Sequence, residues 1–278
     1  MDAFPRTTVG GVSLSRLIIG TNWFLGWSHT SAAKDKFIKS YQTRERLADI
    51  IEVFLRSGVD TLMGMPVAML TDAVKEAEDR VGRKVIFVVT PHFNILPGGP
   101  PEAEPERVFD ECQRLGAKFC FPHQSITDRL LDRMHGIFRD LDKYTAMIRK
   151  RGMIPGLSTH TPESVVIADK TDVDVETYIQ LYNAAGFLMQ IEADWVMRII
   201  RNAKKPVMTI KPLAAGRLLP PVGLAFVWNT LRDCDMVTIG TTTPDEAREV
   251  IDLSLDFINK RIPDNELQRT RSKSGLDS

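Results

Sequence analysis

Short apolar runs alternate with longer helix-like segments along almost the whole chain, and this alternation constrains the fold most. Glycines at 58, 82, 116 and 152 stand where a helix would stop. Eight runs are apolar enough to form buried strands: 16–21, 60–65, 84–90, 118–121, 153–158, 177–182, 206–210 and 236–239. Alternating strands and helices build parallel sheets, so eight such pairs predict an α/β fold, a (β/α)8 TIM barrel.

The stretch before the first strand reads TTVGGVSLS, with a Gly-Gly pair between two alternating segments. This pattern predicts an N-terminal β-hairpin that caps the bottom of the barrel. We expect one barrel domain over 1–262 and a disordered polar tail over 263–278. The expected helical segments are 43–58, 69–82, 104–117, 127–152, 161–170, 191–204, 223–233 and 243–260.

Composition excludes several classes of partner. Thirty-six basic residues balance thirty-six acidic ones without forming a basic stripe, so we expect no binding to nucleic acid or to an anionic membrane surface. No run approaches the roughly 18 apolar residues of a membrane span, and the start lacks a secretory pattern. Three widely spaced cysteines suit reduced thiols. We therefore expect a cytoplasmic protein with a small-molecule substrate, and the oligomeric state stays open.

Three of the five histidines fall within about two residues of expected strand ends: His92, His123 and His160. Enzymes with this fold place their chemistry there, and strands three, four and five are neighbours. The three imidazoles are therefore candidate ligands for a divalent metal, although no Asp or Glu occupies a strand end. Without a metal, the same cluster could perform acid–base chemistry near neutral pH.

Other candidates surround these histidines. Lys211 ends an apolar strand and could act as a base, as a Schiff-base amine or as an anion holder, or could form a salt bridge on the rim. The apolar loop 23–42 is typical of a lid. The start of the last helix could hold a phosphate. Candidate substrate-binding residues are Asn22, Trp23, His29, Gln124, Tyr182 and Asn183.

Several segments resemble the aldo-keto reductase family over residues 6–258: VSLSRLIIGTNWF, KPLAAG at 211–216 and IGTTTPDEAREVI. The resemblance implies carbonyl reduction with NADP(H). It implies a nicotinamide site at Ser158, Thr159 and Gln180. It also implies a cofactor-phosphate site at Thr241, Thr242, Thr243 and Arg248.

The family's catalytic residues are mostly missing. Met63 stands where the family has Asp, no tyrosine occurs between Tyr41 and Tyr144, and Thr90-Pro91 replaces a Thr-Lys pair. Only His123 matches. We therefore favour a non-redox lyase, hydratase or isomerase that acts on a small oxo or sugar-like substrate through His92, His123, His160 and Lys211. The alternatives are an NAD(P)H-dependent reductase with a substituted proton donor, and a non-catalytic barrel that binds a small molecule or a protein.

Overall fold

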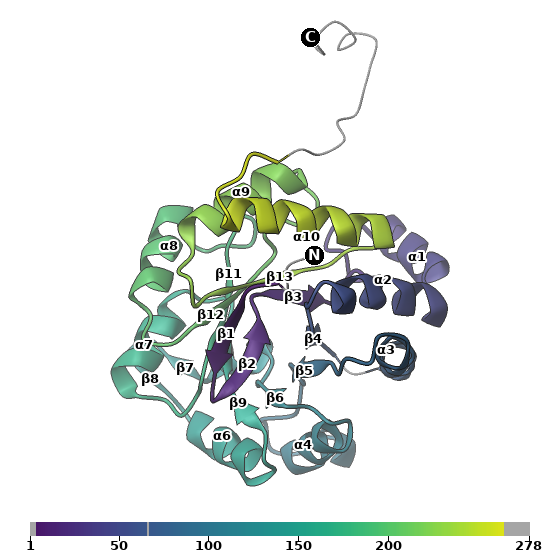
Figure 1. The fold of residues 1–278 in the computed structure, drawn as a ribbon. Coiled ribbons are helices and arrows are strands. Elements are labelled where there is room, and N and C mark those ends of the chain that lie inside the picture. Colours follow the sequence, from purple (N-terminus) through teal and green to yellow (C-terminus); the bar gives the residue numbers. More distant parts are fainter. Residues whose placement is uncertain (1–3, 66, 264–278) are drawn as a thin grey trace, which may run out of the picture.

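Residues 4–65 and 67–263 are described by the computed structural model, and they form a parallel barrel inside a ring of helices (Figure 1). The predicted (β/α)8 barrel is confirmed. Its strands are β3 (Leu17–Gly20), β4 (Thr61–Gly64), β5 (Ile86–Val89), β6 (Phe119–Cys120), β9 (Ile154–Pro155), β10 (Leu157–Ser158), β11 (Tyr178–Leu181), β12 (Val207–Ile210) and β13 (Met236–Ile239).

The barrel closes through an interrupted strand. β9 pairs with β6, β10 pairs with β11, and only Gly156 separates β9 from β10. A Cβ added at Gly156 would lie 2.4 Å from Cε1 of Phe121, so the ring leaves no room for a side chain at this bend. The single run expected at 153–158 is therefore two short strands that belong to one barrel position.

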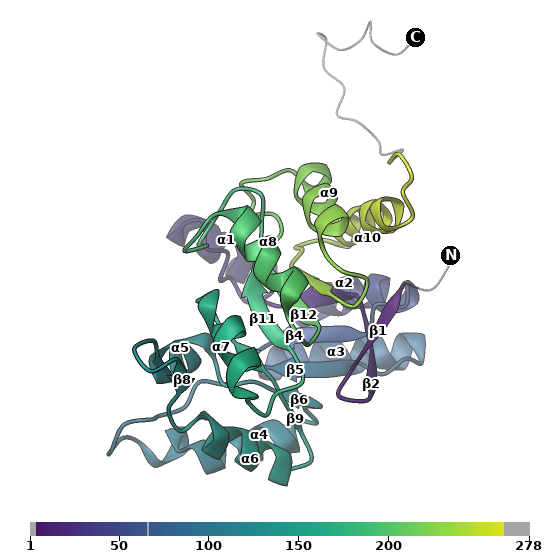
Figure 2. The same cartoon turned by 90° about the vertical axis from the view of Figure 1, so that its left-hand side faces the viewer.

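The predicted hairpin is also present, as β1 (Arg6–Val9) and β2 (Val12–Ser15). Gly10 and Gly11 both have positive φ, 52° and 79°, which the tight turn between paired strands requires. Val9 and Leu14 are buried with the inward side chains of the barrel. Figure 2 shows the hairpin on the side of the barrel opposite α1 (Ala32–Tyr41), so the hairpin covers one end and leaves the other for chemistry.

The remaining helices follow the strands in order. They are α2 (Arg44–Arg56), α3 (Ala68–Val81), α4 (Pro105–Arg114), α5 (Gln124–Leu130), α6 (Leu141–Lys150), α7 (Glu163–Thr171), α8 (Ala193–Asn202), α9 (Pro220–Thr230) and α10 (Pro244–Ile258), with a 3-10 turn, η1, at Pro101–Ala103. α1 lies inside the segment expected to be a loop, 23–42. No helix among the described residues is long and apolar enough to cross a membrane.

The prediction of one long helix over 127–152 is wrong, because a small hairpin interrupts this segment. β7 (Leu131–Asp132) pairs with β8 (Ile137–Phe138), and the chain between them turns through Gly136 with φ of 63°. The Asp132 carboxylate accepts from the backbone N–H groups of Met134 and His135, both at 3.1 Å. These local bonds compete with helical ones. His135 therefore lies in a turn and not on a helix.

Two apolar layers result from the alternation along the strands. The inner layer fills the barrel, for example with Ile18, Phe119 and Ile179, and the outer layer packs the strands against the helices. The predicted tail lies outside the described residues from 264 onward, and the single-domain boundary at 262 stays a prediction.

Candidate active site

A cavity of about 600 Å³ opens at the carboxyl ends of the barrel strands. This is the end at which (β/α)8 enzymes perform their chemistry. The loop after β3 supplies Asn22, Trp23, Trp27, Ser28 and His29; the strand ends supply His123, Gln124, Ser158, His160 and Lys211; and α10 supplies Glu246 and Glu249. The cavity therefore gathers most of the predicted candidates in one place.

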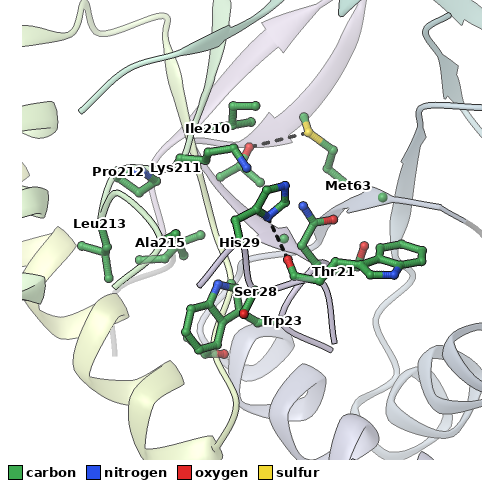
Figure 3. A pocket seen from close by; sticks show the side chains of 18 of the residues that line it. Thr21, Trp23, Ser28, His29, Met63, Ile210, Lys211, Pro212, Leu213 and Ala215 are labelled. Carbon is green, nitrogen blue, oxygen red and sulfur yellow. Dashed lines mark hydrogen bonds between the residues drawn. The ribbon is translucent and has the colours of Figure 1, made fainter. Parts of the chain in front are cut away.

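Lys211 follows β12 directly and has a strained backbone. Its φ is 61°, and Ala214 and Ala215 in the same loop have φ of 50° and 57°. A residue with a Cβ is disfavoured in a left-handed conformation by about 1 kcal/mol or more, and such strain is common at functional sites. Figure 3 shows the Lys211 amine and the His29 ring directed toward one another across the cavity.

Burial controls the protonation of Lys211. It lowers the pKa of this ammonium from 10.5 to about 8, and no carboxylate in the described chain offsets the shift. About one Lys211 side chain in ten is therefore uncharged at neutral pH, an order-of-magnitude fraction that follows from the pKa. An uncharged amine can act as a base or as a nucleophile.

The backbone at His160 is held in position by Asp128 of α5. Burial, together with the nearby positive charges of Lys211 and His123, lowers the pKa of His160 to about 4. Asp128 Oδ2 accepts from the His160 backbone N–H at 3.1 Å, and Asp128 Oδ1 accepts from the Thr159 hydroxyl at 2.5 Å. Burial raises the pKa of Asp128 itself. Asp128 was not predictable as a site residue, because it lies inside a helix and not at a strand end.

The hydrogen bonds of His123 and His29 place the proton of the neutral ring on different nitrogens. The His123 Nδ1 accepts from the backbone N–H of Ser125 at 3.3 Å, so the ring carries its proton on Nε2. The His29 Nδ1 lies 2.9 Å from the carbonyl oxygen of Trp27 and must donate to it, so Nε2 is the free acceptor. Burial lowers the pKa of both rings. The site thus offers one N–H donor and one basic nitrogen.

The predicted metal site is not formed. His92 is exposed and does not line the cavity, and its ring centroid lies 6.2 Å from that of His123. Throughout residues 4–65 and 67–263, no group of three or more His, Cys, Asp or Glu side chains has the arrangement that a metal ion needs. Neighbouring strand ends alone do not fix where side chains point, and this is why the expectation failed.

Two expected substrate-binding residues are used for structure. The Tyr182 hydroxyl donates to Thr230 Oγ1 of α9 at 2.8 Å, so Tyr182 packs in the outer layer. The Asn183 side chain donates to the carbonyl of Phe187 and accepts from its N–H, which closes the loop after β11. Neither residue lines the cavity.

The residues expected to hold the nicotinamide fit it poorly. Ser158 lines the cavity, but the hydroxyl of Thr159 is bonded to Asp128. Gln180 is fully buried with both side-chain atoms unpartnered among the described residues. Because Ile179 lines the cavity, strand alternation directs Gln180 toward the outer layer.

The residues expected to hold the cofactor phosphate are engaged with neighbouring side chains. Glu246 Oε2 accepts from the N–H and hydroxyl of Thr242 at 2.6 and 2.8 Å. Thr243 caps α10, and Arg248 pairs with Asp245 at 2.6 Å. A carboxylate already occupies the helix N-terminus where an anion would bind, and it repels phosphate. This end of the cavity does not fit the cofactor phosphate.

Two buried hydroxyls at the cavity are without hydrogen-bond partners. Thr21 Oγ1 and Thr241 Oγ1 line the cavity region and have no hydrogen-bond partner in the described part of the chain. Buried polar atoms without partners are uncommon, because each lost bond costs about 1–3 kcal/mol. A polar ligand would satisfy them.

No family model matches the sequence, and no curated protein matches it. Solved structures do match. A protein described as a candidate aldo-keto reductase of Pseudomonas aeruginosa is 15% identical, with a TM-score of 0.64, over 93% of this chain and 99% of that one. The aldo-keto reductase of Klebsiella pneumoniae, solved with NADPH, is 16% identical, with a TM-score of 0.59, over 94% and 92%.

These likenesses show a divergent aldo-keto-reductase-like barrel. At 15–16% identity they show the fold alone. A truncated 3-deoxy-D-arabino-heptulosonate 7-phosphate synthase of Thermotoga maritima also matches, at 11% identity and a TM-score of 0.51 over 93% of this chain and 90% of that one. The fold is thus shared by proteins with different names, and the site residues must decide the chemistry.

Proposed function

We propose that this protein is an enzyme that moves a proton next to the carbonyl group of a small oxo or sugar-like compound, as isomerases and lyases do. The observation that carries the proposal is the cavity that combines Lys211, a His123 N–H donor and two neutral imidazoles. Fold likeness to aldo-keto reductases supports a carbonyl compound as the ligand class, and the departures at Met63 and Pro91 argue against their proton-transfer machinery.

Each group has a role that follows from its protonation state. The His123 Nε2–H and the Lys211 ammonium donate to the carbonyl oxygen, which stabilises the negative charge that develops there. The His29 Nε2 and the neutral His160 ring are the candidate bases for the neighbouring C–H. Thr21 and Thr241 offer hydroxyls to substrate hydroxyl groups.

Deuterium exchange tests this proposal without knowledge of the physiological product. Dihydroxyacetone and glyceraldehyde are incubated with the protein in D2O, and the loss of the proton next to the carbonyl is followed by proton NMR. We expect catalysed exchange, and we expect His123→Ala to slow it by a factor on the order of 100. Exchange at the uncatalysed rate with both compounds and with a wider set of small sugars and oxo acids would overturn the proposal.

A nicotinamide-dependent reductase is the second candidate, and one observation favours it. Thr241, Glu246 and Glu249 line the cavity together with the residues at the barrel mouth, so the cavity includes part of the segment that resembles the family's cofactor site. When bound, the nicotinamide would supply hydride. Fluorescence titration with NADPH and NADH separates the candidates, because the reductase needs one of them to bind and the acid–base enzyme does not.

A further inference from the structure

We infer that Lys211 is a nucleophile that captures a small aldehyde or hydroxyketone as an imine at the end of β12. This inference rests on the proposed function, since it assigns a covalent step to the same cavity. It goes beyond acid–base chemistry because it names the atom, Nζ of Lys211, to which the substrate becomes bonded.

The position of Lys211 suits this role. The side chain lines a cavity of about 600 Å³, large enough for a small sugar-like compound, and it is half-buried there. Burial favours the free amine, because the low-dielectric surroundings disfavour the ammonium. A lysine kept for a structural salt bridge would have a carboxylate partner, and none contributes to the protonation of Lys211 within the described residues.

The loop that carries Lys211 is built at an energetic cost. Lys211, Ala214 and Ala215 all adopt left-handed backbone conformations although none is glycine. The turn is fixed by the bond from the Ala214 N–H to the Lys211 carbonyl at 2.9 Å and by the bond from the Thr30 hydroxyl to the Ala215 carbonyl at 3.4 Å. The strained loop therefore holds Lys211 in one place, and strain of this kind is concentrated at functional sites.

The neighbouring imidazoles supply the proton transfers that imine formation needs. The uncharged Nζ attacks the carbonyl carbon, the C=O π bond breaks as the C–N bond forms, and the carbonyl oxygen takes the proton of His123 Nε2–H. The nitrogen gives one proton to a basic nitrogen, His29 Nε2 or the His160 ring, which leaves a neutral carbinolamine. The same imidazole returns this proton to the hydroxyl, which leaves as water when the C–O bond breaks, and the product is a protonated imine. The net reaction joins amine and carbonyl compound and releases one water, without oxidant or reductant.

The charge on an iminium would make the adjacent C–H more acidic, which links capture to the proposed proton transfer. A nitrogen cation conjugated to the reacting carbon accepts the electron pair that the C–H bond leaves behind. The substrate class is therefore a small carbonyl compound with a hydrogen on the carbon next to the carbonyl.

Reductive trapping tests the inference on the wild-type protein. Glycolaldehyde or dihydroxyacetone is added with sodium cyanoborohydride at about pH 7, and the labelled lysine peptides are quantified by mass spectrometry. A pKa of about 8 leaves an uncharged fraction roughly 300-fold larger than that of a lysine at 10.5, although a less basic amine is also less nucleophilic. We expect the Lys211 peptide to be labelled at least about tenfold faster than any other lysine peptide.

Lys205 provides the matched internal control. It is also half-buried, but its Nζ donates to the Val173 carbonyl at 3.2 Å and it does not line the cavity. Lys211 labelling no faster than Lys205 labelling would overturn the imine. If wild-type protein still catalyses deuterium exchange in that case, the proposed function stands without the imine; if exchange is also absent, both fail.

Discussion

Replacement of Lys211 by methionine should stabilise the protein at neutral pH. The folded protein holds an ammonium with a pKa of about 8, whereas the unfolded chain has the ordinary value of 10.5. Each pKa unit corresponds to about 1.4 kcal/mol, so the protonated side chain costs the folded state about 3 kcal/mol at pH 7. Methionine has a similar length and no charge. The free energy of unfolding of Lys211→Met at pH 7 should therefore rise by up to about 3 kcal/mol.

The stabilising effect of Lys211→Met should depend on pH. Between about pH 8 and 10.5 the unfolded chain binds more protons than the folded protein. The free energy of unfolding of the wild type therefore gains from Lys211 as the pH rises through that range. Lys211→Met lacks this contribution. The three cavity histidines have pKa values below 6.5 and do not titrate in the window, and Glu246 and Glu249 are common to both proteins.

Urea unfolding at about pH 7 and about pH 10 measures both effects. Lys205→Met is the control, and we expect it to change stability by less than about 1 kcal/mol. If Lys211→Met is less stable than the wild type at pH 7, or if the stability difference between the two proteins is the same at both pH values, the claim of a destabilised ammonium is refuted.

Three further substitutions test other parts of the structure. Asp128→Ala leaves the Thr159 hydroxyl and the His160 N–H without their acceptor and should lower the free energy of unfolding by about 1–3 kcal/mol in urea, whereas Asp245→Ala, which removes an exposed ion pair, should change it by less than about 1 kcal/mol. Glu246→Ala removes the acceptor of the Thr242 N–H, so thermal unfolding should show a free energy of unfolding that is lower by about 1 kcal/mol. Gly64→Ala would place a Cβ 1.7 Å from Thr21 Oγ1 and should cost about 1–3 kcal/mol, more than Gly82→Ala, where the added Cβ meets nothing within 4 Å and only the left-handed backbone opposes it; equal costs would contradict the packing at the mouth.

The fold could be predicted from the sequence because its signals are periodic. Eight apolar runs separated by helical segments are typical of one fold, and each run supplies one position of the barrel, the run at 153–158 as two short strands. The hairpin at β7 and β8 was not predicted, because the spacing of its apolar residues is also compatible with a helix. Side-chain bonds of Asp132 decide the outcome there, and such bonds depend on geometry that periodicity does not contain.

The site was predictable in place but not in detail. Strand ends located His123, His160 and Lys211 correctly at one cavity, because parallel strands share an end. The direction of each side chain was not predictable. His92 is exposed and does not line the cavity, and Asp128 bonds to the His160 backbone from a helix. Both outcomes follow from packing among elements that are distant in sequence.

One NMR experiment tests the central claim most directly. Dihydroxyacetone, the protein and excess NADH and NADPH are combined in D2O, and the same spectra report deuterium next to the carbonyl and any alcohol formed by reduction. We predict deuterium in recovered substrate or its isomer, at a rate that does not depend on the nicotinamides. Conversion to the alcohol with matching oxidation of either nicotinamide, and no exchange in their absence, would contradict the account and establish the reductase instead.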